Sequence, residues 1–352
     1  MTRREFQVSS VVDSYDAVLV VSFGGPEGPG DVIPFLENVL RGKNVPRERM
    51  LAVAEHYQHF GGVSPINAQN RALTDALRAE LASHKIPLPV YWGNRNWHPM
   101  LVDTLAEMAR DGVRRALALM TSAYSSYSSC RQYLEDIARA QQAVGDRAPQ
   151  VDKLRVFFNH PGFIGPMVER VDEALHKVPD DGRDKAHVIY TAHSIPIAMA
   201  ETSDYVVQLE EASRLVSAEL GVERYQLAYQ SRSGPPQQPW LEPDICDVLR
   251  QLHAETKVRD VVVVPIGFLS DHIEILWDLD TEAREVADSL GLRMVRASTV
   301  GSHPDFVAMV RELIEERTAG APRRALGNLG ASHDTCPLDC CPPLARTTRR
   351  PE

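Results

Sequence analysis

The sequence predicts an α/β protein with two mostly parallel β-sheets, and three patterns support this fold class. Short runs rich in β-branched residues alternate with amphipathic segments, which is typical of βαβ units with helices on both faces of a sheet. A charged break that contains Pro and Gly, at residues 178–185, separates these runs into two groups. The length of 352 residues exceeds one ordinary core and fits two domains plus a tail.

Each predicted strand is a short apolar run, and each predicted helix shows apolar residues on one face. In chain order, we predict strands over residues 16–23, 90–92, 115–121, 154–158, 186–191, 225–229, 261–266 and 293–296. The amphipathic patterns between and after them predict helices over residues 65–82, 101–111, 203–220, 245–253 and 304–318.

The domain limits follow from this element order. We expect a first domain over residues 14–180 and a second over 181–318, with the last helix, 304–318, packing back on the first domain. After residue 319 the chain is dominated by Gly, Pro, Arg and Cys without periodicity. Apart from its cysteines, this tail over residues 319–352 has the composition of a disordered segment.

Composition and charge exclude several classes of protein. A formal net charge of −10 argues against general nucleic-acid binding, which requires a basic surface. The first residues are polar and charged, unlike a signal peptide. The most apolar stretches, near residues 17–23 and 261–269, are too short to span a bilayer and fit buried strands. We therefore expect a cytoplasmic protein without a transmembrane segment.

His193 lies two residues after the end of the strand predicted over residues 186–191. Ligands of open parallel sheets bind at the carboxyl ends of strands, so this imidazole is expected to point into a crevice. A single histidine at such a place is more often a partly buried residue that bonds a neighbouring loop. An imidazole is also a metal ligand and a base near neutral pH.

Glu274, Asp278 and Glu282 recur every four residues, so on a helix they share one face. Unpaired carboxylates at this spacing repel one another, and such a row is favoured when a cation passes along it. Two ordinary interpretations stay open, since Asp271 and Glu274 fit a capping box and the other two fit a solvated face. Together with His193, the row suits a reaction that binds Fe²⁺ and removes protons.

A third group of candidates is basic or hydroxylic and lies in or near predicted loops. Charge-assisted hydrogen bonds from such residues bind the carboxylates of an anionic ligand, although an ordinary surface contact is the simpler interpretation for any single one. These candidates are Arg41, Tyr57, Ser64, Arg95 and Tyr127.

Five segments resemble the motifs of the ferrochelatase family, in the family's order and across most of the chain. They are SFGGP at residues 22–26, GGVSP at 61–65, TAHSIP at 191–196, YQSRSGP at 229–235 with PWLEPD at 239–244, and PIGF at 265–268 with SDHIE at 270–274. The resemblance implies two Rossmann-like domains, each a parallel four-stranded sheet flanked by helices, with a porphyrin cleft between them.

The resemblance also implies an activity and assigns residues to it. It implies a lyase of heme biosynthesis that inserts Fe²⁺ into a porphyrin, with His193 and Glu274 as the catalytic pair at the inner metal site. Asp278 and Glu282 match the outer acidic ridge of the iron path. Phe23 stands where some bacterial members have Tyr, so here it is expected to pack on the macrocycle. A basic residue such as Arg95 lies near the cleft in the family.

The branch of the family that this chain most resembles indicates which porphyrin is the substrate. Members of the Gram-positive branch use coproporphyrin III and yield coproheme, which we expect here, while protoporphyrin IX, giving protoheme, stays open. His56 replaces an Arg that some relatives use near a propionate. Cobalt-chelatase relatives are the closest enzymatic alternative. A non-catalytic tetrapyrrole or iron carrier and a cluster-bearing sensor are alternatives of other classes.

The tail carries Cys336, Cys340 and Cys341, a group that suits a zinc site, reactive thiols or ligands of a cluster. Some ferrochelatases bind a [2Fe–2S] cluster through three C-terminal cysteines plus one internal cysteine, and the resemblance implies this cofactor here. The internal ligand is then Cys130 or Cys246, and we choose Cys130 because Cys246 lies on a predicted helix and fits a buried apolar position. The expected role is structural, since metal insertion involves no net redox change. We expect a monomer with transient contacts to upstream and downstream heme-pathway enzymes.

Overall fold

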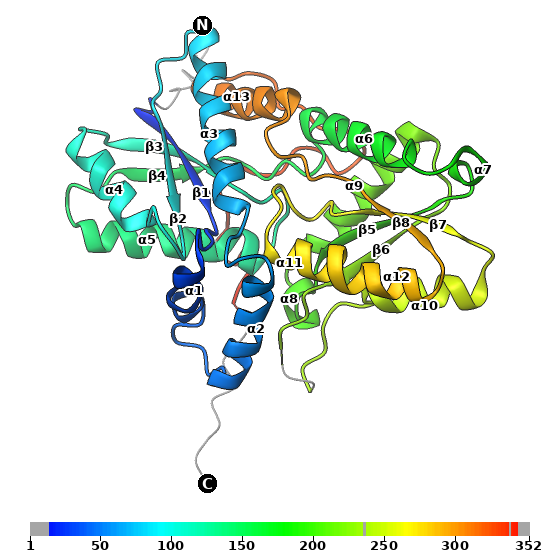
Figure 1. The fold of residues 1–352 in the computed structure, drawn as a ribbon. Coiled ribbons are helices and arrows are strands. Elements are labelled where there is room, and N and C mark those ends of the chain that lie inside the picture. The colour runs from blue at the N-terminus through cyan, green and yellow to red at the C-terminus, as the bar shows by residue number, and fades with distance from the viewer. Residues whose placement is uncertain (1–13, 235–236, 338, 344–352) are drawn as a thin grey trace, which may run out of the picture.

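The computed structural model describes residues 14–234, 237–337 and 339–343. Its strands form two parallel four-stranded sheets that lie side by side, with helices on both faces of each (Figure 1). The strands are β1 (Ala17–Ser22), β2 (Val90–Asn94), β3 (Arg115–Met120), β4 (Gln150–Lys153), β5 (His187–His193), β6 (Tyr225–Gln230), β7 (Asp260–Val264) and β8 (Arg293–Arg296).

The helices lie between these strands and after the last one. They are α1 (Val32–Val39), α2 (Arg47–His59), α3 (Ile66–Ser83), α4 (Leu101–Arg110), α5 (Gln132–Val144), α6 (Pro161–Leu175), α7 (Asp180–Arg183), α8 (Ile197–Ala200), α9 (Tyr205–Leu220), α10 (Ile245–Glu255), α11 (Ile273–Trp277), α12 (Arg284–Ser289) and α13 (Pro304–Thr318). A 3-10 turn, η1 (Pro29–Asp31), precedes α1, and π-helical turns form η2 (Tyr127–Arg131) and η3 (Asp278–Ala283).

The two sheets share one topology. Their strand orders are β2-β1-β3-β4 and β6-β5-β7-β8, so the second half of the chain repeats the arrangement of the first. Within both sheets all neighbouring strands are parallel. The predicted fold class is confirmed, and the common strand order shows a repeat that is not visible as sequence similarity.

Successive side chains of the central strands β1 and β7 point to opposite faces of their sheets and so enter different apolar cores. Val18 and Val20 of β1 and Val262 and Val264 of β7 enter one core that lies between the sheets and includes residues of α3, α6, α9 and α13. The alternate residues of the same strands face outward to α4 and α5 on one side and to α10 and α12 on the other. Each fully buried Val contributes roughly 1.5–3 kcal/mol relative to an exposed one.

The fourth strand lies earlier than we predicted. The structure has β4 at Gln150–Lys153, paired with β3, and the apolar run at residues 154–158 is a loop. The run is buried because α6 and α13 pack over it, with Phe157 in ring contact with Phe163 and Phe306. Tertiary packing, not sheet pairing, therefore explains its apolar character.

Two helices cross between the halves. α6 precedes the predicted boundary near residue 180 but packs against α9, β7 and β8 of the second sheet. α13 follows the second sheet but packs against α3, where Arg311 and Glu80 form a salt bridge of 2.8 Å. The division at residue 180 stays a prediction, because both helices tie the halves into one continuous core.

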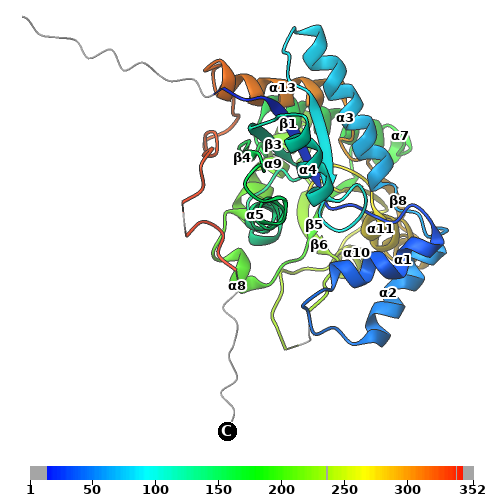
Figure 2. The ribbon, with the colours of Figure 1, turned by 90° about the vertical axis from the view of Figure 1, so that its left-hand side faces the viewer.

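The tail is held by buried polar residues of the loop after β4. The Arg155 guanidinium donates to both carboxylate oxygens of Glu316 at 2.8 Å and to the carbonyl oxygen of Arg324 at 2.8 Å. Asn159 donates to the carbonyl oxygens of Leu326 and Gly330. Figure 2 shows this orange-red segment running from α13 down one side of the molecule toward α8. Its described residues thus have firm anchors besides the cysteines.

Candidate active site

The carboxyl ends of the central strands of the second sheet bring the candidate residues together. His193 ends β5 and lies in register with Gln230, the last residue of β6. The backbone N–H of Gly267, after β7, donates to the carbonyl oxygen of Thr191 at 3.0 Å. A Cβ at Gly267 would lie 2.6 Å from the Cβ of Ala192, so only glycine permits this approach. This close approach of the loop after β7 to β5 places the start of α11 beside the end of β5.

His193 and Glu274 lie close together where the loop after β7 approaches the end of β5. Nε2 of His193 lies 3.7 Å from Oε2 of Glu274, and the two side chains remain about one-third and one-half exposed. Nδ1 of His193 donates to the carbonyl oxygen of Ser194 at 2.5 Å, so in the neutral ring the lone pair is on Nε2. The basic nitrogen of the neutral imidazole, Nε2, therefore points toward Glu274 and the space beside it.

The charges of the pair stabilise each other. Burial lowers the pKa of His193, but the Glu274 charge and its hydrogen bond outweigh this and raise the pKa above its usual value. Burial raises the pKa of Glu274, but His193 and His272 outweigh it and hold that pKa well below its usual range. Nε2 of His272 lies 3.3 Å from Oε2 of Glu274. The site thus favours an ionised carboxylate beside an imidazole that readily accepts a proton.

Asp278 continues the acidic row one turn further out. Burial and the Glu274 charge raise the pKa of Asp278 to about 7. The Ser231 hydroxyl donates to its carboxylate, and Nε2 of Gln230 does so at 3.4 Å. Ser231 has a left-handed φ of 64°, which a non-glycine residue adopts only at a cost. That strained turn holds the hydroxyl against Asp278.

The helix widens where the acidic row leaves the interior. Asp278 begins the π-helical turn η3, which also contains Glu282, and Glu282 is exposed. Single π-helical turns occur frequently at functional sites. The predicted capping box does not form, because Asp271 pairs with Arg296 at 3.2 Å and makes no side-chain cap. Glu274 is therefore free of that local role.

Aromatic residues from the first half of the chain face this site. Phe35 is in ring contact with Phe23, Tyr57 and Trp97. Burial and the Glu274 charge raise the pKa of Tyr57, which lies on α2, a helix that packs against α11. His56 of α2 stacks on Trp277 of α11, with ring centroids 3.9 Å apart and an angle of 9°. The apolar cluster of α1 and α2 therefore forms a wall that α2 joins to α11, the helix of Glu274.

The polar candidates of the first half have partners within the chain. Arg95 forms a salt bridge with Asp136, stacks on the Tyr133 ring at 4.3 Å and is 6% exposed at its side chain. Tyr127 donates to Glu135 at 3.1 Å, and Arg41 donates to Asn38. Ser64 is buried, and a Cβ on Gly25 would lie 2.7 Å from the Cβ of Ser64. Of this group, Arg41 alone is exposed.

Sequence reasoning missed His272, Ser231 and Trp277 as parts of the site. His272 lies two residues before Glu274, and that spacing within an acidic segment was an available signal. Nothing in the sequence marks the strained conformation of Ser231, because serine is ordinarily compatible with an extended strand end. The Trp277–His56 stack joins residues more than two hundred positions apart, which no local pattern reveals.

The tail brings its cysteines to Cys130. Cys130 lies buried in η2, and the neighbouring Cys336 thiol, together with burial, raises its pKa. The Cys340 and Cys341 sulfurs are 3.7 Å apart, and Nε2 of His333 lies 3.7 Å from the Cys340 sulfur. The possible ligand atoms of His333, Cys336 and Cys340 all lie within 4.8 Å of one another. The hydrogen bond from Cys130 lowers the pKa of Cys336.

Cys246 lies elsewhere. It is on α10, beside the apolar core on the outer face of the second sheet, and its nearest charged neighbours include Asp244 and Glu282. Burial raises the pKa of Cys246 to about 12, as expected of an unreactive packed thiol. Four thiols with a histidine beside them are the soft donors that iron–sulfur clusters and zinc take. The residues present therefore fit a soft metal centre, which includes an iron–sulfur cluster.

The fold is similar to that of two solved SirB structures. The solved structure of SirB from Bacillus subtilis with Fe³⁺ has a TM-score of 0.57 to this chain at 11% sequence identity, covering 87% of this chain and 97% of SirB. A second SirB structure, a sirohydrochlorin chelatase in complex with cobalt, has a TM-score of 0.50 and the same coverage. These similarities support the two-sheet fold alone.

The family model named ferrochelatase matches residues 15–318. The chain belongs to the ferrochelatase family. A ferrochelatase of Rhodopirellula baltica is 54% identical over 97% of both chains. A coproporphyrin III ferrochelatase of Streptomyces coelicolor is 54% identical over 94% of both chains.

Membership of the ferrochelatase family confirms the predicted type of enzyme, a lyase of porphyrin metabolism that takes Fe²⁺ as substrate. The His193–Glu274 pair and the acidic row lie in the matched residues, whereas the tail cysteines lie beyond them. Among the described residues, no helix has both the length and the apolar character needed to cross a bilayer.

Proposed function

We propose that this ferrochelatase inserts Fe²⁺ into coproporphyrin III and forms coproheme, as a step of heme biosynthesis. The observation that carries the proposal is the pairing of Nε2 of His193 with the Glu274 carboxylate at the ends of parallel strands. The substrate is supported by relatives named coproporphyrin III ferrochelatase at 54% identity in two Streptomyces species.

The reaction exchanges two pyrrole protons for one metal ion. His193 accepts the two protons one after the other at Nε2, because Nδ1 is held by its hydrogen bond to Ser194, and passes each to solvent through its exposed edge. Glu274, held ionised by His193 and His272, binds the cation and stabilises the imidazolium that forms. One positioned base contributes about 10²–10⁴-fold to such a proton transfer.

The acidic row gives Fe²⁺ a route to that pair. Glu282 is exposed, Asp278 is half-buried, and Glu274 contacts the base, so carboxylates lead from the surface inward. The porphyrin ring lies against Phe23 and Tyr57 on the opposite wall. Arg41 and Ser64 bind propionates, and Arg95 and Tyr127 do so by exchanging their partners Asp136 and Glu135 for the ligand.

The tail binds a [2Fe–2S] cluster through Cys130, Cys336, Cys340 and Cys341. Its role is structural, because iron insertion transfers no electron, and it joins the end of the tail to η2. Thiolate ligands require reduced cysteines, which agrees with a cytoplasmic protein. One chain supplies the pair, the acidic row and the cysteines, so a monomer, the form we propose, contains every proposed site. Neighbouring pathway enzymes contact it transiently.

Turnover with the two candidate porphyrins tests the substrate. Pure protein is incubated without oxygen with Fe²⁺ and either coproporphyrin III or protoporphyrin IX, and iron insertion is followed by absorbance. We expect kcat/KM for coproporphyrin III to exceed that for protoporphyrin IX by at least about tenfold, a difference of about 1.4 kcal/mol. Equal values, or a preference for protoporphyrin IX, would reject the proposed substrate.

A further inference from the structure

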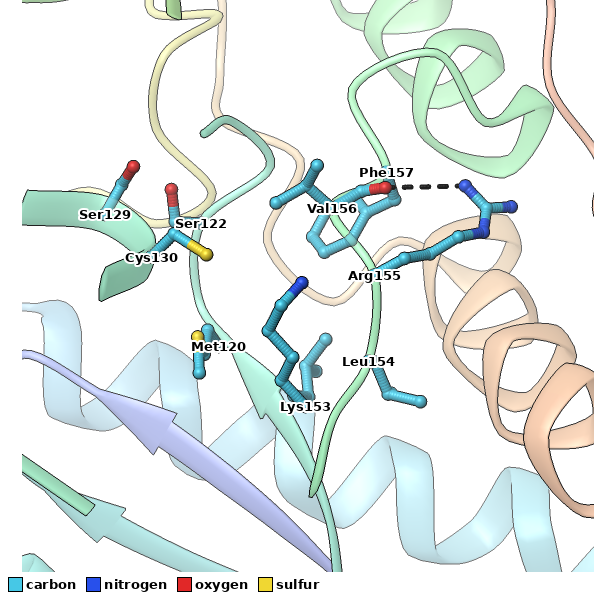
Figure 3. Close-up of a pocket in the computed structure, with 10 residues that line it drawn as sticks. Met120, Ser122, Ser129, Cys130, Lys153, Leu154, Arg155, Val156 and Phe157 are labelled. Atoms are coloured by element: carbon cyan, nitrogen blue, oxygen red, sulfur yellow. Dashed lines mark hydrogen bonds between the residues drawn. The ribbon is translucent and has the colours of Figure 1, made fainter. Parts of the chain in front are cut away.

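Lys153 is the last residue of β4, and its side chain lies in the protein interior. The residue is 5% exposed. It lines a cavity of about 10 Å³ together with Cys130 and Ser122, which is room for one water molecule. Figure 3 shows the Lys153 ammonium and the Cys130 thiol directed into the same small space, while the Arg155 side chain extends away from it.

The ammonium of Lys153 has no anionic partner in the described part of the chain. Its one hydrogen bond there goes to the carbonyl oxygen of His333 at 3.5 Å, and no carboxylate lies within salt-bridge distance. A buried ammonium without a counter-charge is costly, so such groups are ordinarily paired. Arg155, two residues further on, shows the usual solution, because Glu316 neutralises it.

The cysteines supply the missing negative charge. The Cys130 thiol lines the same cavity as the Lys153 ammonium, so a thiolate ligand there lies beside the buried cation. The tail that carries Cys336 reaches the same ammonium through the carbonyl oxygen of His333. A [2Fe–2S] core bound by four thiolates is a net anion, and one-electron reduction adds a further negative charge.

We propose that Lys153 is a positioning residue of the cysteine site, whose buried ammonium is the counter-ion of the thiolate-bound cluster and raises its reduction potential. The inference rests on the proposed [2Fe–2S] cluster. Net charge and hydrogen bonds near the sulfurs are among the features that set cluster potentials, and a fixed buried cation acts through both. Lys153 also holds the backbone of His333, so it ties the tail to β4.

The experiment compares the wild-type protein with Lys153→Met, Lys153→Arg and the control Lys177→Met. Methionine keeps an unbranched apolar chain without the charge, arginine keeps the charge, and Lys177 is exposed in the turn after α6. All four are purified without oxygen, and iron, sulfide and visible absorbance are measured per chain. The midpoint potential of the cluster is then determined by reductive titration with dithionite and redox dyes.

We expect Lys153→Met to shift the potential to more negative values by about 59 mV, which is a tenfold change for one electron. Lys153→Arg and Lys177→Met should stay close to wild type. If Lys153→Met instead loses the cluster, retention in Lys153→Arg supports the counter-ion role, whereas loss in both assigns the effect to packing and overturns it. A full cluster with unchanged potential in Lys153→Met overturns the counter-ion role of Lys153 and leaves the proposed cluster in place. Wild-type protein without iron and sulfide overturns the cluster as well.

Discussion

Nε2 of His193 lies 3.7 Å from Oε2 of Glu274, so the end of β5 and the start of α11 present a base and a carboxylate to the same space. The approach depends on Gly267, whose missing Cβ lets the loop after β7 touch Ala192. A base and a hard oxygen ligand at this separation suit the exchange of protons for a metal ion. The predictions below test this pair, the acidic row, the cysteines and the anchors of the tail.

Replacing His193 by Ala removes the proposed proton acceptor. We expect kcat for iron insertion to fall about 10²–10⁴-fold while porphyrin binding, followed by fluorescence quenching, is retained. The exposed residue His253 on α10 provides the matched control, and His253→Ala should keep wild-type turnover. Full turnover of His193→Ala at saturating substrates would remove His193 from the mechanism.

Asp278 should make the apparent affinity for Fe²⁺ depend on pH. Burial and the Glu274 charge raise its pKa to about 7, so the carboxyl is neutral below this pH and negative above it. The KM for Fe²⁺ is therefore expected to fall as pH rises through about 7. Asp278→Asn should flatten this dependence, and the exposed control Glu285→Gln should keep it. An identical pH profile in Asp278→Asn contradicts the assignment.

The two internal cysteines should behave differently. Cys130 lies next to Cys336, whose thiol raises its pKa, whereas Cys246 lies on α10 beside a different core. We expect Cys130→Ser, purified without oxygen, to lose the absorption of the cluster and its iron and sulfide. Cys246→Ser is the matched control and should retain them. A full cluster in Cys130→Ser would exclude Cys130 as a ligand.

Loss of either partner of the Arg155–Glu316 ion pair should strongly lower the free energy of unfolding. Its side chains are 0% and 3% exposed, so Arg155→Met leaves a buried carboxylate that keeps only the more distant Arg323, at 3.9 Å, as a cation. We expect the free energy of unfolding, measured by urea denaturation, to fall by about 3–5 kcal/mol. The double variant Arg155→Met/Glu316→Leu should recover part of this loss. A double variant less stable than Arg155→Met would contradict the explanation.

His160 should make the protein sensitive to mild acid. Burial, followed by the charges of Arg155 and Arg324, lowers its pKa from 6.5 to about 3. Glu312 lies 3.4 Å from its Nε2, but Arg324 binds both oxygens of that carboxylate, so the ring stays neutral. Below about pH 6.5 the unfolded chain binds a proton that the folded one excludes. Stability due to this group is therefore lost as pH falls.

The size of this effect is about 1.4 kcal/mol in unfolding free energy per pH unit between these two pKa values. Nδ1 of His160 accepts from the backbone N–H of Gly162 at 3.0 Å, a cap that Asn also provides. Denaturation of His160→Asn at several pH values should therefore show a shallower loss of stability in acid. An unchanged slope would mean that His160 is protonated in the folded protein.

Within the described residues, local sequence patterns were sufficient for seven of the eight strands and for the residues at their ends. The predicted helix over residues 304–318 is α13 itself, and His193 ends β5 as expected. Both results depend on periodicity and on the position of a polar residue after an apolar run. The motifs around Glu274 also located the start of α11 to within a few residues.

Features that depend on distant partners were missed. The run at residues 154–158 was predicted as a strand because its burial is caused by α6 and α13, not by a neighbouring strand. The tail was expected to lack anchors other than its cysteines, because the side chains that bind it, Arg155 and Asn159, lie more than 160 positions earlier. The wider turn at η3 arises from backbone hydrogen bonding that composition does not encode.

Repeated turnover with coproporphyrin III tests the central claim most directly. Wild-type protein is mixed, without oxygen, with a tenfold excess of coproporphyrin III and of Fe²⁺, and the absorbance of free and iron-bound porphyrin is followed to completion. If the chain is a coproporphyrin III ferrochelatase, all of the porphyrin is converted, which means about ten turnovers per chain. Conversion or binding that stops at one porphyrin per chain would contradict the claim and indicate a carrier.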